Sequence, residues 1–113
     1  MGASEKPLVC VGTTLERLRA FPAAARREAG HQLHRVQCGL DTGDWRPMPT
    51  VGAGVVELRV HAEGEFRVCY VASFAEAVYA LHAFGKKTRR TRRADIEIAR
   101  RNLAAVRRAR LAR

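Results

Sequence analysis

The stretch that decides the fold runs from Val55 to Val71 and reads VVELRVHAEGEFRVCYV. In its first half, apolar and polar side chains alternate with a period of two, which is typical of a β-strand whose two faces meet different surroundings. A turn with the sequence Ala62-Glu63-Gly64-Glu65 interrupts the alternation, which then resumes as far as Tyr70. The pattern therefore predicts two antiparallel strands joined by a tight turn.

These two predicted strands carry polar side chains on one face and apolar side chains on the other. The polar face holds Glu57, Arg59, His61 and Arg67. A third strand over Ala77–Phe84 follows after a short turn, so the simplest arrangement is an antiparallel meander. The apolar face of such a sheet must be buried by helices.

The residues before the hairpin predict one more strand and two helices. Leu8–Val11 is a short β-branched run typical of a strand, and Thr13 with Glu16 has the spacing of a capping box that opens a short helix. A second helix carries apolar residues at steps of three and four: Phe21, Ala25, Ala29, Leu33 and Val36. Gly39 is a suitable stop for this helix.

The remaining segments predict a loop and a final helix. Residues 41–49 are rich in Asp, Gly and Pro and predict a loop, in which Trp45 would cover the core. Thr91 is placed to cap the final helix, with Asp95 in its first turn. The apolar stripe of that helix comprises Ile96, Ala99, Leu103 and Val106. Arg110 falls on the same stripe, so the last turn is predicted to leave the core.

Together these elements predict a single α+β domain over residues 1–113. Their order is β-αα-βββ-α, with an antiparallel sheet packed against a helical hairpin and a basic C-terminal helix. The ends, residues 1–6 and about 107–113, are predicted to be flexible. The three cysteines stand at wide, unpatterned spacing, which argues against a disulfide scaffold.

The formal charge of the chain is +10, and all of the excess lies near the C-terminus. Residues 86–113 contain twelve Lys and Arg against two acidic residues, whereas residues 1–85 contain nine of each. A neutral body with a basic end is typical of a protein that binds a polyanion. The sequence has no apolar run typical of a signal peptide or a membrane span, which predicts a cytoplasmic protein.

Basic side chains from three predicted strands converge at one end of the polar face. The set comprises Arg59, Arg67, Lys86 and Lys87, with the carboxylate of Glu57 among them. Cations fixed on rigid strands suit phosphate binding, because the planar guanidinium can donate paired hydrogen bonds to phosphate oxygens. The alternative is a solvated sheet face held by salt bridges between Glu57 and its neighbours.

Four stretches together resemble the RelE/ParE toxin superfamily, and more closely the phage-derived, HigB-like subgroup of type II toxin–antitoxin systems. They are residues 45–49 (WRPMP), 52–59 (GAGVVELR), 66–70 (FRVCY) and 81–88 (LHAFGKKT). The resemblance extends from Val11 to about Ala105. The element order predicted above is also the order of the RelE-like fold.

The resemblance implies a toxin that inhibits translation as an endoribonuclease, cutting mRNA on the ribosome without a metal or other cofactor. In this reaction the 2′-hydroxyl of a nucleotide attacks the adjacent phosphate and leaves a cyclic phosphate and a free 5′-hydroxyl. It also implies a helix-turn-helix antitoxin of the HigA type as partner. Operator DNA would be contacted only through that antitoxin, and no membrane is involved.

Residue roles follow from the resemblance position by position. Arg67 matches a strand arginine that contacts the scissile phosphate, and Lys87 stands in the place of a second catalytic arginine. Lys86 precedes it as in the family motif, and Arg59 matches a basic residue that supports RNA contacts. Two further residues adjoin the site and are predicted to hold RNA by backbone contacts: Arg89 and Arg90.

The proton acceptor of the reaction has two candidates. Glu57 could act as general base or could be a structural partner of the neighbouring arginines. His82 is the alternative base, although its alternation with Phe84 can turn it into the core. RelE-type enzymes carry lysines at the positions of Val55 and Glu57 and often end with a catalytic aromatic residue, whereas no tyrosine follows Tyr79 here.

These departures leave two other functions open. The first is a non-enzymatic toxin of the ParE type, which inhibits DNA gyrase on the same fold. The second is an inactive prophage relic that only binds its antitoxin and DNA. The cluster of Arg67, Lys86 and Lys87 favours the nuclease, because a gyrase inhibitor needs no phosphate site.

Possible metal ligands occur on the second predicted helix. His31, His34 and Cys38 fall at positions i, i+3 and i+7, a spacing that can face one ion. Since only three ligands are present and no fourth is near them in the sequence, the sequence predicts no metal site.

Overall fold

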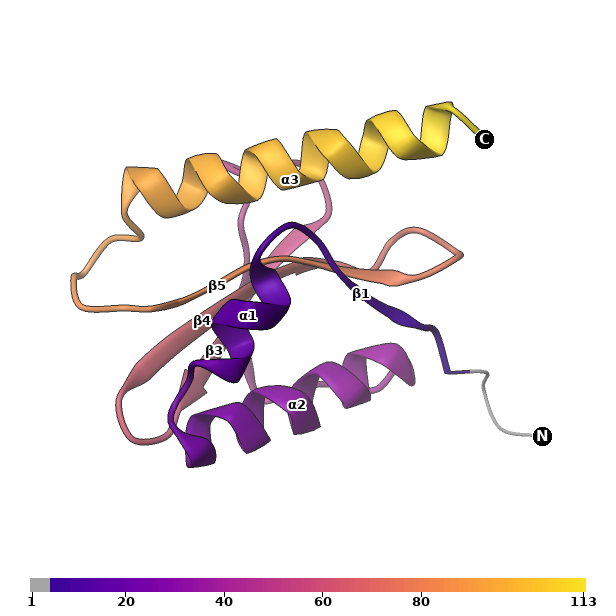
Figure 1. The fold of residues 1–113 in the computed structure, drawn as a ribbon. Helices are drawn as coiled ribbons and strands as arrows, with labels where there is room; N and C mark the ends of the chain where they lie inside the picture. Colours follow the sequence, from indigo (N-terminus) through magenta and orange to yellow (C-terminus); the bar gives the residue numbers. More distant parts are fainter. Residues whose placement is uncertain (1–4) are drawn as a thin grey trace.

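The computed structural model describes residues 5–113 and has a five-stranded sheet between two layers of helix (Figure 1). Along the chain the elements are β1 (Leu8–Cys10), α1 (Thr14–Arg19), α2 (Ala23–Gln37), β2 (Asp44–Pro47), β3 (Val55–His61), β4 (Glu65–Val71), β5 (Val78–Gly85) and α3 (Arg93–Leu111). The predicted α+β class and its C-terminal helix are confirmed.

The sheet has the strand order β1-β5-β4-β3-β2. The predicted meander of β3, β4 and β5 is confirmed, and every pair among these strands is antiparallel. β1 joins β5 in parallel, with Leu8 opposite Val78, so the sheet is mixed. The tight turn between β3 and β4 places Glu63 and Gly64 at positive φ, as a short hairpin connection requires.

The prediction of a loop over residues 41–49 is wrong in its second half. Asp44–Pro47 forms β2, an antiparallel edge strand in which Arg46 is opposite Glu57. All four side chains of β2 are exposed, so no alternation of apolar residues marked the strand. Pro47 is tolerated because an edge strand leaves one side of its backbone unpaired. Trp45 is 49% exposed and does not cover the core.

Both faces of the sheet are buried. On one face Ala25, Ala29 and Leu33 of α2 pack in the same cluster as Leu58 and Val60 of β3. On the other face, α3 covers the side of the sheet that carries the predicted polar cluster. Its apolar residues pack with those of the strands in one cluster: Ala99, Leu103, Val106, Val55, Val71 and Leu81. The polar residues of the meander therefore lie partly beneath a helix.

Two predicted helix caps are wrong. α1 begins at Thr14, and the Thr13 hydroxyl caps no backbone amide; it accepts a hydrogen bond from Arg17 Nε at 3.1 Å. α3 begins at Arg93 with Arg92 as its N-cap residue. The Thr91 hydroxyl instead donates to Glu57 Oε2 at 2.9 Å. In each case the threonine hydroxyl that the sequence pattern assigned to the start of the helix is hydrogen-bonded to another side chain instead.

The stop of α2 is confirmed in detail. The helix ends at Gln37, and Gly39 follows with a φ of 71°. The Gly39 amide donates to Val36 O at 3.0 Å and the Leu40 amide to Arg35 O at 2.9 Å. These two bonds form a Schellman motif, which requires a residue of positive φ and so favours glycine.

The last turn of α3 does not leave the body of the protein. Arg110 Nε donates to Glu76 Oε2 at 2.6 Å, and its guanidinium lies 4.0 Å from the centre of the Phe74 ring. Residues 107–113 are nevertheless all exposed, so the prediction that the last turn leaves the core is confirmed; Arg110 keeps this turn in contact with the surface of the body. Of the predicted flexible end at residues 1–6, residues 1–4 lie outside the described part of the chain.

Candidate functional site

The candidate site is built on the register of three neighbouring strands. Arg46 on β2 is opposite Glu57 on β3, and Arg59 on β3 is opposite Arg67 on β4. Two arginines directly opposite each other repel unless an anion compensates them. Glu57 Oε1 supplies that anion, at 3.3 Å from Arg46 Nε, 3.7 Å from Arg67 Nε and 4.0 Å from Arg59 Nε.

Glu57 is completely buried, with no exposed surface on its side chain. One carboxylate oxygen faces the three arginines, and the other accepts the hydrogen bond from Thr91. A buried carboxylate is stable only when it is paired and hydrogen-bonded, and Glu57 meets both conditions. These contacts fit the interpretation of Glu57 as a structural partner better than the interpretation as a general base.

Arg67 lies deeper than the sequence suggested. Its side chain is 7% exposed, and Nη1 donates to the Phe66 carbonyl at 2.9 Å and to Glu65 Oε1 at 3.2 Å. Its Nε is buried without a hydrogen-bond partner, as is Nε of Arg59. Arg59 is 28% exposed and pairs with Asp44 Oδ1 at 3.6 Å. Arg67 therefore uses Nη1 for hydrogen bonds within the protein, whereas Arg59 is held by ion pairs with Asp44 and Glu57.

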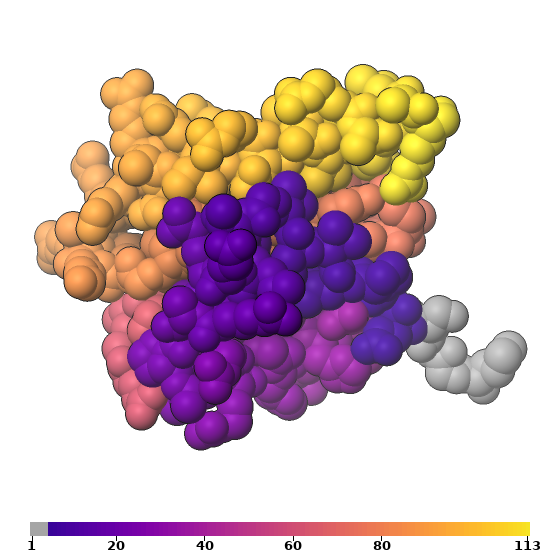
Figure 2. Space-filling view, viewed as in Figure 1, coloured from indigo at the N-terminus to yellow at the C-terminus, as the bar shows by residue number. Residues whose placement is uncertain are grey.

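The segment that follows β5 carries the accessible basic residues. The Lys86 amide donates to Glu65 O at 2.8 Å, which fixes the start of the segment, and the Lys86 side chain is half-buried beside the cluster. Burial is the main cause that lowers the pKa of Lys86; Glu57 opposes the shift. Three further basic residues of the segment are exposed: Lys87, Arg89 and Arg90. In Figure 2 this orange segment projects at one end of the molecule, beside the start of α3.

A groove of about 380 Å³ lies between this segment and β2. Its basic residues are Arg46 on β2 and Arg89 and Arg90 on the segment after β5, and its apolar residues include Pro47 and Met48. Guanidinium groups beside an apolar surface suit a single-stranded nucleic acid, because the guanidinium groups can bind its phosphates while the apolar surface packs against its bases. Sequence reasoning missed Arg46 as a site residue, because the pairing of β2 with β3 that brings it to Glu57 leaves no mark in the local sequence pattern.

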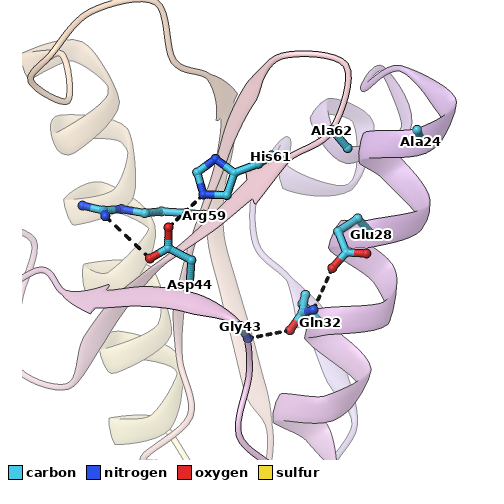
Figure 3. Close-up of a pocket in the computed structure, with 8 residues that line it drawn as sticks. All are labelled: Ala24, Glu28, Gln32, Gly43, Asp44, Arg59, His61 and Ala62. Carbon is cyan, nitrogen blue, oxygen red and sulfur yellow. Dashed lines mark hydrogen bonds and ion pairs between the residues drawn. The ribbon is translucent and has the colours of Figure 1, made fainter.

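A second pocket, of about 440 Å³, lies between α2 and the edge of the sheet (Figure 3). Its charged side chains already have partners within the pocket. His61 Nε2 lies 2.8 Å from Asp44 Oδ2, and this hydrogen bond is the main cause that lowers the pKa of Asp44. Gln32 donates to Glu28 Oε1 at 2.7 Å and accepts from the Gly43 amide at 3.0 Å. Among the residues that line the pocket, Arg59 pairs with Asp44 at 3.6 Å.

His82, the alternative base, is enclosed between β5 and α3. Its side chain is 1% exposed, its ring stacks on Phe84 with centroids 5.2 Å apart, and Nε2 lies 2.7 Å from Asp95 Oδ1. Burial lowers the pKa of His82, while the hydrogen bond to Asp95 opposes that shift. The prediction that His82 can point into the core is confirmed, and Asp95 does lie in the first turn of α3.

The cysteines carry no disulfide. Cys10, Cys38 and Cys69 are all free thiols, and burial raises the pKa of Cys69 to about 12. Within the described residues, one group of side chains could hold a metal ion; it consists of Glu5, His34 and Cys38 and lies on α2, away from the arginine cluster.

A comparison with protein families covers the residues of this site. The model of the family "Phage derived protein Gp49-like (DUF891)" matches residues 16–104, which include every strand of the site and the basic segment. No curated protein sequence matches the chain. No helix among residues 5–113 is long and apolar enough to cross a membrane.

Proposed function

The chain belongs to the phage-derived Gp49-like family, a family of RelE-like toxins, and on that premise we propose that it is a toxin that cuts mRNA on the ribosome. The observation that carries the proposal is the basic groove of Arg46, Arg89 and Arg90 beside the Glu57 cluster. Its partner is proposed to be a helix-turn-helix antitoxin of the HigA type, through which any contact with operator DNA is made.

The proposed reaction is attack of a 2′-hydroxyl on the adjacent phosphate. The new bond joins O2′ to phosphorus, the bond from phosphorus to O5′ breaks, and one proton moves from O2′ to a base while O5′ gains another. Lys87 and Arg67 are proposed to stabilise the charge on the phosphate oxygens. Lys86 lies beside the cluster, where burial lowers its pKa, and it is proposed to contact the RNA next to Lys87.

The remaining residues are proposed to bind and to position. Arg89 and Arg90 are proposed to hold the RNA backbone, and Arg46 joins them across the groove. Arg59 does not line this groove; it is proposed to support the RNA contacts from the neighbouring position on β3, where it lies 4.0 Å from Glu57. Glu57 is proposed to hold the three strand arginines and Thr91 in place, since its own oxygens are engaged by them. Of the two roles that the sequence left open for Glu57, general base and structural partner, this proposal takes the second.

Burial of Arg67 and Glu57 also favours a second candidate, a toxin of the ParE type that inhibits DNA gyrase without cutting RNA. A gyrase inhibitor needs no accessible phosphate site, and two of the predicted catalytic residues have little exposed surface. The exposed basic residues of the segment after β5 favour the nuclease.

One experiment separates these functions. The toxin is expressed in cells, and mRNA 5′ ends are mapped by primer extension beside the Lys87→Ala variant, whose side chain is exposed and leaves the core intact. New 5′ ends inside translated regions that disappear in the variant support cleavage. Arg108→Ala, an exposed change on α3, is the control that should still cut. Growth arrest with intact mRNA and trapped gyrase would overturn the nuclease.

A further inference from the structure

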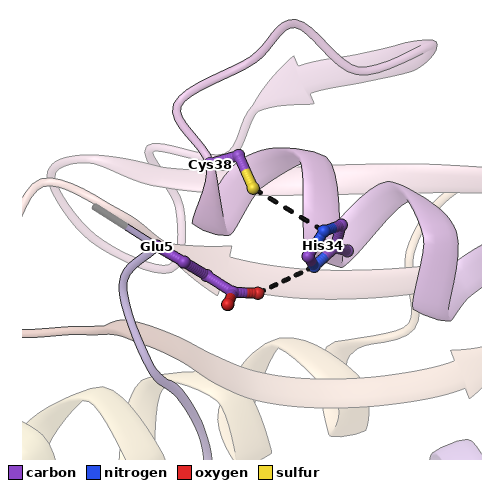
Figure 4. A group of neighbouring side chains, drawn as sticks. All are labelled: Glu5, His34 and Cys38. Atoms are coloured by element: carbon purple, nitrogen blue, oxygen red, sulfur yellow. Dashed lines mark hydrogen bonds and ion pairs between the residues drawn. The ribbon is translucent and has the colours of Figure 1, made fainter. Parts of the chain in front are cut away.

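The end of α2 brings a thiol and an imidazole together. His34 and Cys38 are one helical turn apart on the same face, and Cys38 Sγ lies 3.7 Å from His34 Nε2. The other ring nitrogen, Nδ1, lies 2.9 Å from Glu5 Oε1 (Figure 4). One ligand atom from each of the three residues lies within 4.8 Å of the others.

Backbone contacts hold Glu5 in this place. The Lys6 amide donates to Gln37 O at 3.0 Å, and Gln37 Nε2 donates to Lys6 O at 2.8 Å. These reciprocal bonds join the segment before β1 to the end of α2, with Glu5 directly beside them. These bonds fix the backbone next to Glu5, and this places the Glu5 carboxylate beside the imidazole ring of His34.

We propose that His34 Nε2 and Cys38 Sγ chelate one thiophilic divalent cation such as Zn²⁺, with Glu5 orienting the imidazole. With Zn–N and Zn–S distances of about 2.1 and 2.3 Å, the separation of 3.7 Å corresponds to an N–Zn–S angle of about 114°, close to tetrahedral. A neutral ring that donates Nδ1–H to Glu5 directs the lone pair of Nε2 toward the thiol.

The charges and the exposure fit such a site. Binding releases the thiol proton to solvent, and the thiolate together with the Glu5 carboxylate balances the two positive charges of the ion. The side chains of His34 and Glu5 are 60% and 52% exposed, so an ion can enter and water can complete its coordination. His31, which the sequence grouped with these ligands, is not among the three.

The site is independent of the proposed RNA reaction. α2 packs on one face of the sheet, whereas Glu57 and its arginines lie on the side that α3 covers (Figure 1). An ion bound here would join the segment before β1 to α2. The unfolded chain lacks this arrangement of ligands and binds the ion less tightly, so the bound ion stabilises the fold.

Titration of the full chain with Co²⁺ tests the proposal, since a cobalt–thiolate bond gives a charge-transfer band in the near ultraviolet. We expect the band at one equivalent of Co²⁺, its displacement by Zn²⁺, and a higher melting temperature with either ion. Cys38→Ser and His34→Gln should abolish the band, and Glu5→Gln should weaken binding about 10- to 100-fold.

Two matched variants serve as controls, Cys10→Ser and His31→Gln, and both should keep the band. No band at an excess of Co²⁺, or a band that survives Cys38→Ser, would overturn the proposal. Circular dichroism checks that each variant is folded; all of these side chains are at least partly exposed. Toxicity of Cys38→Ser should equal that of the wild type, so the outcome does not depend on the nuclease.

Discussion

The hydroxyl of Thr91 donates a 2.9 Å hydrogen bond to Glu57, a carboxylate with no exposed surface. These residues are 34 positions apart in the chain. The bond connects the basic segment after β5 to the centre of the sheet. It also sets the distance between Arg89 and Arg90 on one wall of the groove and Arg46 on the other.

Thr91→Val should therefore loosen the groove. The change keeps the shape of the side chain but removes the hydroxyl, which leaves Glu57 Oε2 without its donor. We expect a loss of about 1–3 kcal/mol in the free energy of unfolding, measured with urea. Affinity for a short single-stranded RNA should also fall, whereas Thr91→Ser should keep both values. Unchanged stability in Thr91→Val would contradict the role given to this bond.

Glu57→Gln distinguishes a positioning residue from a general base. The amide keeps the size of the carboxylate but leaves three arginine side chains without their shared anion. We expect a loss of about 3–5 kcal/mol in unfolding free energy, because removing one partner of a buried ion cluster strands the others. If the variant is instead as stable as the wild type and has lost only mRNA cleavage, Glu57 is the general base.

Salt dependence should reveal how many phosphates the groove contacts. Each phosphate contact with a single strand contributes about 0.7 to the slope of log affinity against log salt concentration. The Arg89→Ala/Arg90→Ala double variant should therefore lower the slope by about 1.4. A charge-matched control, Arg27→Ala/Arg108→Ala, removes two exposed arginines away from the groove and should leave the slope near the wild-type value. Equal slopes in the two double variants would exclude the groove as the RNA site.

Stability should fall on the acid side because of His82. Burial lowers the pKa of this imidazole in the folded protein, so the unfolded chain binds the proton more readily. The free energy of unfolding should then decrease as the pH falls below the unfolded pKa of roughly 6.5 and approaches the folded pKa. Urea denaturation of His82→Asn should show a smaller decrease over that range. A decrease of the same size in the variant would assign the effect to other groups.

His61 should act in the opposite sense. Hydrogen bonds to Glu65 and Asp44 raise its pKa in the folded protein. Its contribution is present below roughly pH 6.5 and is lost as the pH rises through the folded pKa. His61→Gln should therefore lower the free energy of unfolding below roughly pH 6.5 and flatten its decrease on the alkaline side. Since the side chain is 50% exposed, solvent screens this effect.

The sequence predicted the fold well wherever one residue pattern dominated. The alternation in Val55–Val71 gave the hairpin, and the apolar steps from Ala25 to Leu33 gave the buried face of α2. β2 was missed because it is a strand only through its pairing with β3. Its side chains are all exposed and show no pattern that would indicate this pairing. The alternation of apolar and polar residues reveals a strand only when one of its faces is buried, and β2 has no buried face.

The sequence predicted which strand residues lie together better than it predicted how far they are buried. Glu57, Arg59 and Arg67 do converge, as the alternation indicated. Their burial was not predictable, because it depends on α3 and the segment after β5 folding back over the polar face. Thr91 and Asp95 show the same limit. The sequence pattern places both at the start of the last helix, but in the structure Thr91 is hydrogen-bonded to Glu57 and Asp95 to His82. Such long-range partners leave no trace in local spacing.

The parallel pairing of β1 with β5 has a consequence for when the protein becomes complete. Leu8 must meet Val78, a residue synthesised seventy positions later, and contacts of such separation form slowly. The first strand has no place in the sheet until the last strand exists. During synthesis the emerging chain therefore lacks the finished sheet that carries Arg67 and the basic segment, and the sheet is complete only after β5 has been made.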